Sequence, residues 1–402
     1  MRVQLWSYNY DPEPQGIAPL SATVGRGLAR RGHEVLVVAA HPHYPEPAWG
    51  VRLRPYRERR DGIPVLRLPL WPGRGSGFAR IRQELTFLAS LSAIAPLLPT
   101  ADVVIAVTPS FPALGTAAAF ARARHTPWVM WVQDIVTDGA TTTGQLKEGR
   151  LLREARRLER ASYAAASRIV VISEAFRENL LAKGVQNAKI ERIFNPITRE
   201  PDEPNDLAAI SGQPPQILAM GNIGHTQGLD RIIDAFQASD ALTALGARLV
   251  IAGGGVAADH ARSRIASDRV SMPGVLYGDE LTPVIRATSI GLVSQRSDIT
   301  EFNLPSKLMN YMAYGLPVLA SVNPHSETAR IVKESGGGWV TDAADPTAFA
   351  ARANELLRDR QVLQEAGRAG HTYAQANFAP ARVAERFERV LETAVAPGDV
   401  RR

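Results

Sequence analysis

Residues 216–239 read QILAMGNIGHTQGLDRIIDAFQAS, and this stretch decides the fold class. The apolar run 216–220 predicts a buried strand, and residues 229–239 predict a helix. Three glycines fall between them and predict a tight loop. A strand joined to a helix through a short loop is the building unit of an α/β sheet.

The same alternation of strand and helix runs through both halves of the chain. Apolar runs typical of buried parallel strands recur at 3–8, 34–40, 65–68, 103–107, 128–132, 168–172, 216–220, 248–252, 275–277, 290–293 and 317–320. Helical segments separate them, among them 18–31, 78–96, 148–166, 306–314 and 346–358. The pattern predicts an α/β fold with two Rossmann-like domains, each with a parallel sheet, facing an interdomain cleft.

A change of composition marks the boundary between the halves. Residues 195–206, NPITREPDEPND, contain three prolines and several turn formers, which is typical of a linker. We therefore expect an N-terminal domain over 1–195, a linker over 196–215, a C-terminal domain over 216–378 and a final segment over 379–402.

Composition excludes several functional classes. The 402 residues include no cysteine, so disulfides, thiolate metal sites and cysteine nucleophiles are ruled out. The eight histidines show no metal-binding spacing, and we expect no protein-held metal. Neither an export signal nor a membrane span is evident, so we expect a cytoplasmic protein.

Positive charge is concentrated in residues 52–82. This segment holds nine arginines against Glu58 and Asp61, whereas the whole chain carries a formal charge of +6. A solvated surface is one interpretation. The other is a surface that faces anionic lipid head groups or an anionic acceptor, which would place the protein peripherally at the inner face of the cell membrane. Nucleic acid is not expected, since aromatic residues are rarely interleaved with the arginines.

Glycines near predicted helix starts are candidates for anion binding. Gly16 follows the first strand, while Gly221 and Gly224 follow the first strand of the second half. Such loops offer backbone amides and the positive end of a helix to a phosphate. A simple turn explains Gly16 equally well. The run of three glycines at 253–255 fits either close approach to a nucleoside or a tight turn.

The most specific stretch is 301–320, EFNLPSKLMNYMAYGLPVLA. Pro305, Ser306 and Lys307 are placed at a predicted helix start. A lysine there opposes the helix dipole, which is better explained if a phosphate also binds at this point. Asn310 lies one turn later and can bond sugar hydroxyls. Asp134 ends the strand-like run 128–132 and can orient a hydroxyl, or else cap a helix.

These motifs together resemble those of the retaining glycosyltransferases of family four, which have the GT-B fold. The stretches YNYDPEPQGI at 8–17, GHEV at 32–35, PHYP at 42–45, VQD at 132–134, GNIG at 221–224, QGL at 227–229 and LPSK at 304–307 are similar to the colanic-acid-type exopolysaccharide subgroup. The resemblance covers about residues 1–390 and is more specific for fold and general activity than for sugars.

The resemblance implies transfer of a sugar from a nucleoside diphosphate donor, with retention and without an essential metal or other cofactor. The acceptor would be a glycan, a lipid-linked or a small molecule. Lys307 and Asp134 would be catalytic. The donor-binding residues would be Gly16, Gly221, Asn222, Gly224, Gln227, Gln295, Ser306, Lys307 and Asn310. The final helix, at 381–394, would return to the N-terminal domain.

This chain departs from the family pattern at two places. Asn222 and Gln227 stand where the family commonly has an arginine and a lysine. The family also commonly has a pair of glutamates. In this chain Phe302 stands at the first of these positions, with Glu301 next to it, and Asn310 stands at the second. Lys307 is the candidate for the missing positive charge, although a point charge does not reproduce an Arg–Lys pair.

Other functions fit parts of the pattern. The same chemistry on a soluble secondary-metabolite aglycone and a GT-B-type sugar-nucleotide epimerase are the main alternatives. A catalytically inactive binding module would also fit the two departures. A dinucleotide-dependent oxidoreductase fits the repeated α/β halves but lacks the G-x-G-x-x-G fingerprint.

Overall fold

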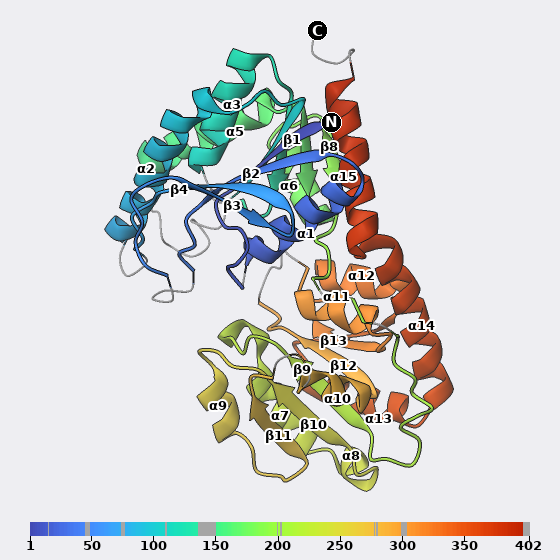
Figure 1. Ribbon diagram of the computed structural model, residues 1–402. Helices are drawn as coiled ribbons and strands as arrows, with labels where there is room; N and C mark the ends of the chain where they lie inside the picture. Colours follow the sequence, from blue (N-terminus) through green and yellow to red (C-terminus); the bar gives the residue numbers. More distant parts are fainter. Residues whose placement is uncertain are drawn as a thin grey trace. The chain divides into compact units, whose positions relative to one another are not determined.

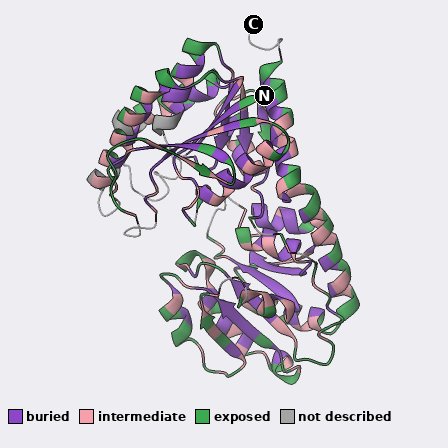
Figure 2. Cartoon of the chain, viewed as in Figure 1, coloured by how far each residue is buried: buried purple, intermediate pink, exposed green. Residues whose placement is uncertain are grey.

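The computed structural model describes residues 1–14, 16–44, 49–73, 77–108, 111–135, 150–198, 200–201, 203–276, 278, 280–298 and 304–396. The chain divides into two compact units (Figure 1). Unit 1 comprises Met1–Thr198 and Pro380–Arg402, and unit 2 comprises Arg199–Ala379. Each has its own hydrophobic core, and Figure 2 shows that the sheet strands are mostly buried.

Unit 1 is built on one sheet, whose described strands follow the order β3-β4-β2-β1-β5-β6-β7-β8. The strands are β1 (Arg2–Ser7), β2 (Glu34–Ala40), β3 (Tyr56–Arg60), β4 (Ile63–Leu68), β5 (Val103–Val107), β6 (Trp128–Val132), β7 (Arg168–Val171) and β8 (Ile190–Arg192). Neighbours pair in parallel, except that β3 and β4 form an antiparallel hairpin at the edge. The sequence did not predict β3, because an edge strand needs no apolar run and this one reads YRERR.

Helices follow most of the strands of unit 1. They are α1 (Ile17–Arg30), α2 (Gly77–Ile94), α3 (Phe111–Arg124), α5 (Arg150–Ala165), α6 (Glu174–Ala182) and α15 (Pro380–Val395), with 3-10 turns at Ala95–Leu97 and Asn187–Lys189. Helix α15 packs on α1 so closely that a Cβ atom at Gly27 would lie 2.5 Å from the Cβ of Ala384. Glu388 of α15 also accepts a hydrogen bond from Arg31 Nε at 2.6 Å.

Unit 2 is built on a parallel sheet, whose described strands follow the order β11-β10-β9-β12-β13-β14. The strands are β9 (Gln216–Met220), β10 (Arg248–Ala252), β11 (Val270–Gly274), β12 (Ile290–Ser294), β13 (Val318–Val322) and β14 (Gly338–Asp342). The helices are α7 (Leu229–Gln237), α8 (Asp240–Ala244), α9 (Ala258–Ser263), α10 (Leu281–Arg286), α11 (Ser306–Ala313), α12 (Glu327–Ser335), α13 (Pro346–Leu357) and α14 (Arg360–Asn377), with a 3-10 turn at His225–Gln227.

The two α/β domains with parallel sheets are as the sequence predicts, but one strand was misplaced. The strand expected at 275–277 is wrong: β11 ends at Gly274, and Tyr277 lies outside the described residues. Because β11 is an edge strand that pairs with β10, it tolerates Pro273 and needs little apolar surface. The prediction placed the strand at 275–277 because those residues, directly after β11, are apolar.

Candidate functional site

Two glycine loops pack against each other at one edge of the unit 2 sheet. Strands β9 and β10 are parallel neighbours, so the loops after them meet at their carboxyl ends. Gly221 N donates to Ala252 O at 2.9 Å, and Ile223 N donates to Gly254 O at 2.8 Å. A Cβ atom at Gly253 would lie 1.8 Å from Gly221 O. Loop packing therefore accounts for the glycine run at 253–255, which the sequence left open.

Lys307 joins the first of these loops through a chain of polar contacts. It lies in the first turn of α11, whose N-cap Pro305 provides no side-chain hydrogen bond. Its Nζ donates to Gln227 Oε1 at 2.9 Å, and Gln227 Nε2 donates to the backbone oxygen of Asn222. A Cβ atom at Gly221 would lie 4.0 Å from Lys307 Cε. We call Gly221, Asn222, Gln227 and Lys307 the lysine cluster.

The lysine cluster can attract an anion in two ways. Its ammonium group carries a full positive charge, and the amides at the start of α11 add the positive end of a helix dipole. The first turn of α11 contains no acidic residue that would neutralise this charge. Such an arrangement suits the phosphates of a nucleotide.

Four other predicted donor residues border the lysine cluster. Ser306 is exposed and begins α11, and Asn310 is half-buried one turn later. Within the described part of the chain their side chains make no hydrogen bond, so both are available to a ligand. Gln295 follows β12, and the next residue, Arg296, donates its backbone N–H to Thr226 O at 2.8 Å. Gly224 belongs to the same loop, where a Cβ atom would lie 3.4 Å from Asn222 Nδ2.

A buried tyrosine braces the strand that carries this loop. Tyr311 of α11 donates its hydroxyl to Leu218 O at 2.8 Å and accepts from Met220 N at 2.8 Å. Burial raises the pKa of the Tyr311 hydroxyl, so that it stays neutral at any physiological pH. The bond fixes α11, and with it Lys307, against the end of β9.

The remaining two predicted residues, Gly16 and Asp134, lie in unit 1 rather than with the lysine cluster. Gly16 is the N-cap of α1 and has a φ of 68°, a left-handed value that favours glycine. Asp134 lies after β6 with an exposed side chain, and its backbone N–H donates to Thr108 Oγ1 at 3.2 Å. The preceding Gln133 pairs with Asn195 through two amide hydrogen bonds, of 2.6 and 2.9 Å. Glu301 and Phe302 lie outside the described residues.

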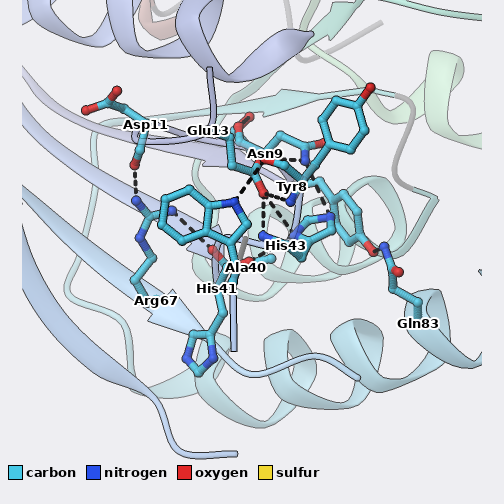
Figure 3. A network of polar contacts seen from close by, with 12 residues as sticks. Tyr8, Asn9, Asp11, Glu13, Ala40, His41, His43, Arg67 and Gln83 are labelled. Carbon is cyan, nitrogen blue, oxygen red and sulfur yellow. Dashed lines mark hydrogen bonds and ion pairs between the residues drawn. The ribbon is translucent and has the colours of Figure 1, made fainter. Parts of the chain in front are cut away.

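The sequence reasoning missed a buried polar network in unit 1 (Figure 3). At its centre, Glu13 Oε1 accepts hydrogen bonds from His43 N at 2.6 Å and Tyr44 N at 2.9 Å. Its other oxygen accepts from Asn9 Nδ2 at 2.6 Å. The available signal was an acidic residue between two prolines in the loop after β1, together with the PHYP stretch after β2.

The basic segment is only partly a surface. Arg67 is fully buried, and its guanidinium donates to Glu58 Oε1 at 2.8 Å, to Ala40 O at 3.1 Å and to Asp11 O. Its assignment to a charged surface is therefore wrong, because a buried arginine with three acceptors serves the fold. Although burial raises the pKa of Glu58, hydrogen bonds from Arg60 and Arg67 outweigh it and hold that pKa below its ordinary value. Among the arginines of this segment whose burial is described, 52, 54, 57 and 59 are exposed, while Arg74 lies outside the described residues.

The chain matches two glycosyltransferase families, one in each half. Residues 15–196 match the glycosyl transferase 4-like domain, and residues 214–359 match glycosyl transferases group 1. The chain is a two-domain glycosyltransferase. Among curated relatives, WcaI of Escherichia coli (strain K12), which carries the name of a colanic acid biosynthesis glycosyl transferase, is 27% identical over 84% of this chain and 87% of its own. The glycosyltransferase WbjE of Pseudomonas aeruginosa is 27% identical over 70% of this chain and 71% of its own.

Solved structures agree on the fold of this glycosyltransferase. Sucrose-phosphate synthase from Thermosynechococcus elongatus superposes with a TM-score of 0.71 at 16% identity, over 99% of this chain and 100% of that one. Anabaena HepE, solved in complex with UDP, has a TM-score of 0.69 at 13% identity, over 98% of this chain and 100% of that one. The fold is GT-B. Within the described ranges, every helix is too short or too polar to cross a bilayer.

Proposed function

We propose that this glycosyltransferase transfers a sugar from a nucleoside diphosphate sugar to an acceptor hydroxyl in exopolysaccharide or glycoconjugate assembly. The lysine cluster is the observation that carries the proposal. It combines a lysine, a helix start and a glycine loop at the carboxyl edge of a parallel sheet, where α/β proteins bind nucleotides. The name of WcaI, a colanic acid biosynthesis glycosyl transferase, supports a role in polysaccharide assembly.

In this proposal the donor's two phosphates bind at the lysine cluster. Lys307, Ser306 and the amides of 221–224 hold them, Gln295 and Asn310 bind the rest of the donor, and Gly16 is a further donor-binding residue. Negative charge builds on the diphosphate as the bond to the sugar breaks. A cation placed beside the leaving group stabilises that transition state more than the ground state.

The proposed reaction retains the configuration at the anomeric carbon and needs no metal. Lys307 and the start of α11 supply positive charge at the leaving group, which is the task a divalent cation performs in other transferases. The acceptor hydroxyl attacks the face that the diphosphate leaves and passes its proton towards the departing phosphate, while Asp134 orients the acceptor. Trapping of a covalent glycosyl–enzyme on a side chain would contradict this front-face route.

A panel of UDP-, GDP-, ADP- and TDP-sugars tests the proposal. We expect one donor to raise the melting temperature and to release its nucleotide when an acceptor is added, with EDTA present. HepE was solved with UDP and with UDP-glucose, so UDP-glucose is the first donor to try. Interconversion of two nucleotide sugars without an acceptor would show an epimerase instead. Stabilisation by a donor that is never turned over, with any acceptor, would show a binding module.

We also propose that one face of unit 1 lies on an anionic lipid surface. Helix α2 buries Phe87 and Leu91, yet it leaves Ile81 and Leu85, one turn apart, 55% and 58% exposed. A helix with apolar residues on both faces indicates a partner for the outer one. Nearby Trp71 and Leu97 are 47% and 77% exposed, and Arg82 lies 5.3 Å from the Trp71 ring centroid.

Charge complementarity selects a lipid surface as the partner. The exposed arginines at 52, 54, 57 and 59 belong to the same unit as this apolar face, and each basic residue near an anionic membrane contributes about 1 kcal/mol. The acceptor would then be lipid-linked.

Sedimentation with vesicles tests this surface. We expect binding to phosphatidylglycerol vesicles at low salt but not to phosphatidylcholine vesicles, with weaker binding in Leu85→Ser and in Arg52→Gln/Arg54→Gln. Leu181→Ser, at an exposed leucine of α6, is the matched control. Equal binding by all four proteins, or efficient transfer to soluble acceptors alone, would contradict the surface.

A further inference from the structure

In the loop between β1 and α1, the described residues 8–14 are tied to the segment after β2 by one carboxylate. Glu13 is 2% exposed, and its side chain makes the three hydrogen bonds described above. Two of the donors are backbone amides of the second segment, at His43 and Tyr44. The third is Asn9, within the loop itself. Glu13 thereby joins two segments about 30 residues apart in sequence at the carboxyl edge of the sheet (Figure 3).

Each oxygen of Glu13 has a distinct task. Oε1 accepts both backbone amides, and Oε2 accepts from Asn9 Nδ2. His43 packs into the same place: its Nδ1 lies 2.9 Å from His41 O and its Nε2 lies 3.4 Å from Asn9 Nδ2. Its Nδ1 also lies 3.2 Å from Glu13 Oε1. A group at position 13 must therefore accept from three donors, which a carboxylate does best.

Other contacts anchor the earlier part of the same loop. The Tyr8 hydroxyl accepts a hydrogen bond from Gln83 Nε2 of α2 at 2.6 Å. The Tyr8 ring makes edge-on contacts with the rings of His43 and Phe87, and each of their centroids lies 4.9 Å from the Tyr8 centroid. Arg67 donates to the backbone oxygen of Asp11. In sequence, Glu13 is nearer to Gly16 than Tyr8 and Asp11 are.

The start of α1 is open to an anion. Gly16 supplies no side-chain cap, and the first turn contains no acidic residue. Among the described residues, no side chain caps the amides of this helix start. Where they point depends on the loop that Glu13 holds.

We propose that Glu13 is a positioning residue for sugar transfer: its carboxylate fixes residues 8–14 on residues 43–44 and so aims Gly16 and the first amides of α1 at an anionic group of the donor. This inference rests on the proposed function. Glu13 acts through the loop and touches no substrate. Its effect should therefore appear in the use of the donor and in the order of the loop.

A swap of hydrogen-bond direction tests the inference. In Glu13→Gln the new amide nitrogen faces Asn9 Nδ2, so two donors meet. In Asn9→Asp two carboxylates meet. In the double variant Glu13→Gln/Asn9→Asp, the amide of residue 13 donates to the carboxylate of residue 9, and the bond is restored in reverse. Glu191→Gln, at an exposed position of β8, is the control for loss of a glutamate charge.

Two readouts are needed, both below the melting temperature of every variant. Each single variant should lower kcat/KM for the donor by roughly tenfold to a hundredfold, since small misplacements of binding groups have effects of this size. Amide hydrogen exchange at the start of α1 should be faster in both. The double variant should recover kcat/KM to within about threefold of the wild type, because the two changes are coupled.

The readouts separate this inference from the proposed function. Single variants that lose stability but keep kcat/KM and exchange rates at wild-type values would overturn the positioning role, as would a double variant no better than the singles. A wild-type protein that transfers sugar from no donor would overturn the proposed function. In that case, unchanged exchange in Glu13→Gln would still refute control of the loop by Glu13.

Discussion

Replacing Lys307 with alanine is the sharpest perturbation of the proposed site. The ammonium group is half-buried and held by Gln227 Oε1 at 2.9 Å. A unit charge about 4 Å from a phosphate oxygen interacts with it by about 4 kcal/mol at the effective dielectric typical of such sites. Part of that energy is already present when the donor binds. If about 3 kcal/mol arises only as charge builds on the leaving group, kcat should fall by roughly a hundredfold.

The assay is nucleotide release at saturating donor, with the melting temperature measured on the same samples. The fold should survive, because the hydrogen bond to Gln227 that the variant loses contributes about 1 kcal/mol. Lys333→Ala is the matched control, since Lys333 is exposed on α12 of the same unit. It should keep the wild-type rate. A Lys307→Ala enzyme that is folded and turns over within twofold of wild type would refute the assignment of the leaving-group charge to this lysine.

Two further predictions concern the framework of each unit. Gly253→Ala should lower the melting temperature by roughly 5–10 °C, because its Cβ atom would lie 1.8 Å from Gly221 O. Gly115→Ala in α3 is the control: the new atom has open space around it, so this variant should have an unchanged or higher melting temperature. Equal melting temperatures for the two would show that the glycine loops are not packed as described. Glu388→Gln should lower the urea midpoint at pH 7. Hydrogen bonds from Arg31 hold the pKa of Glu388 below its ordinary value. The ionised Glu388 therefore stabilises the folded state above about pH 4.5, and this stabilisation is lost as the pH falls through the lowered pKa. The urea midpoints of the wild type and the variant should therefore converge in acid, whereas a difference that persists there, or one matched by the exposed Glu392→Gln, would contradict the role of this ion pair.

The sequence predicted those features that have local signals. Buried parallel strands such as β9 and the start of α11 follow from apolar runs and from a proline at a helix start, and both were found within a residue or two. The edge strands β3, β8 and β14 were missed and the edge strand β11 was misplaced, because edge strands need little apolar surface. Gly221, Asn222 and Gln227 lie together because they are close in sequence. Lys307 lies beside them because α11 follows β12, and β12 is the neighbour of β9 in the sheet.

Contacts between distant segments were beyond the reach of the sequence. Arg67 reads as one more arginine of a basic run, although it is buried against Glu58 and two backbone carbonyls. Glu13 reads as a loop residue, although it accepts backbone amides from the segment after β2. The roles of such residues depend on which strands become neighbours, and no local pattern states this.

A structure with a bound nucleotide sugar tests the central claim most directly. We expect a phosphate oxygen within hydrogen-bond distance of Lys307 Nζ and of an amide between Gly221 and Gly224. A diphosphate bound away from Lys307 and from residues 221–224 would contradict it.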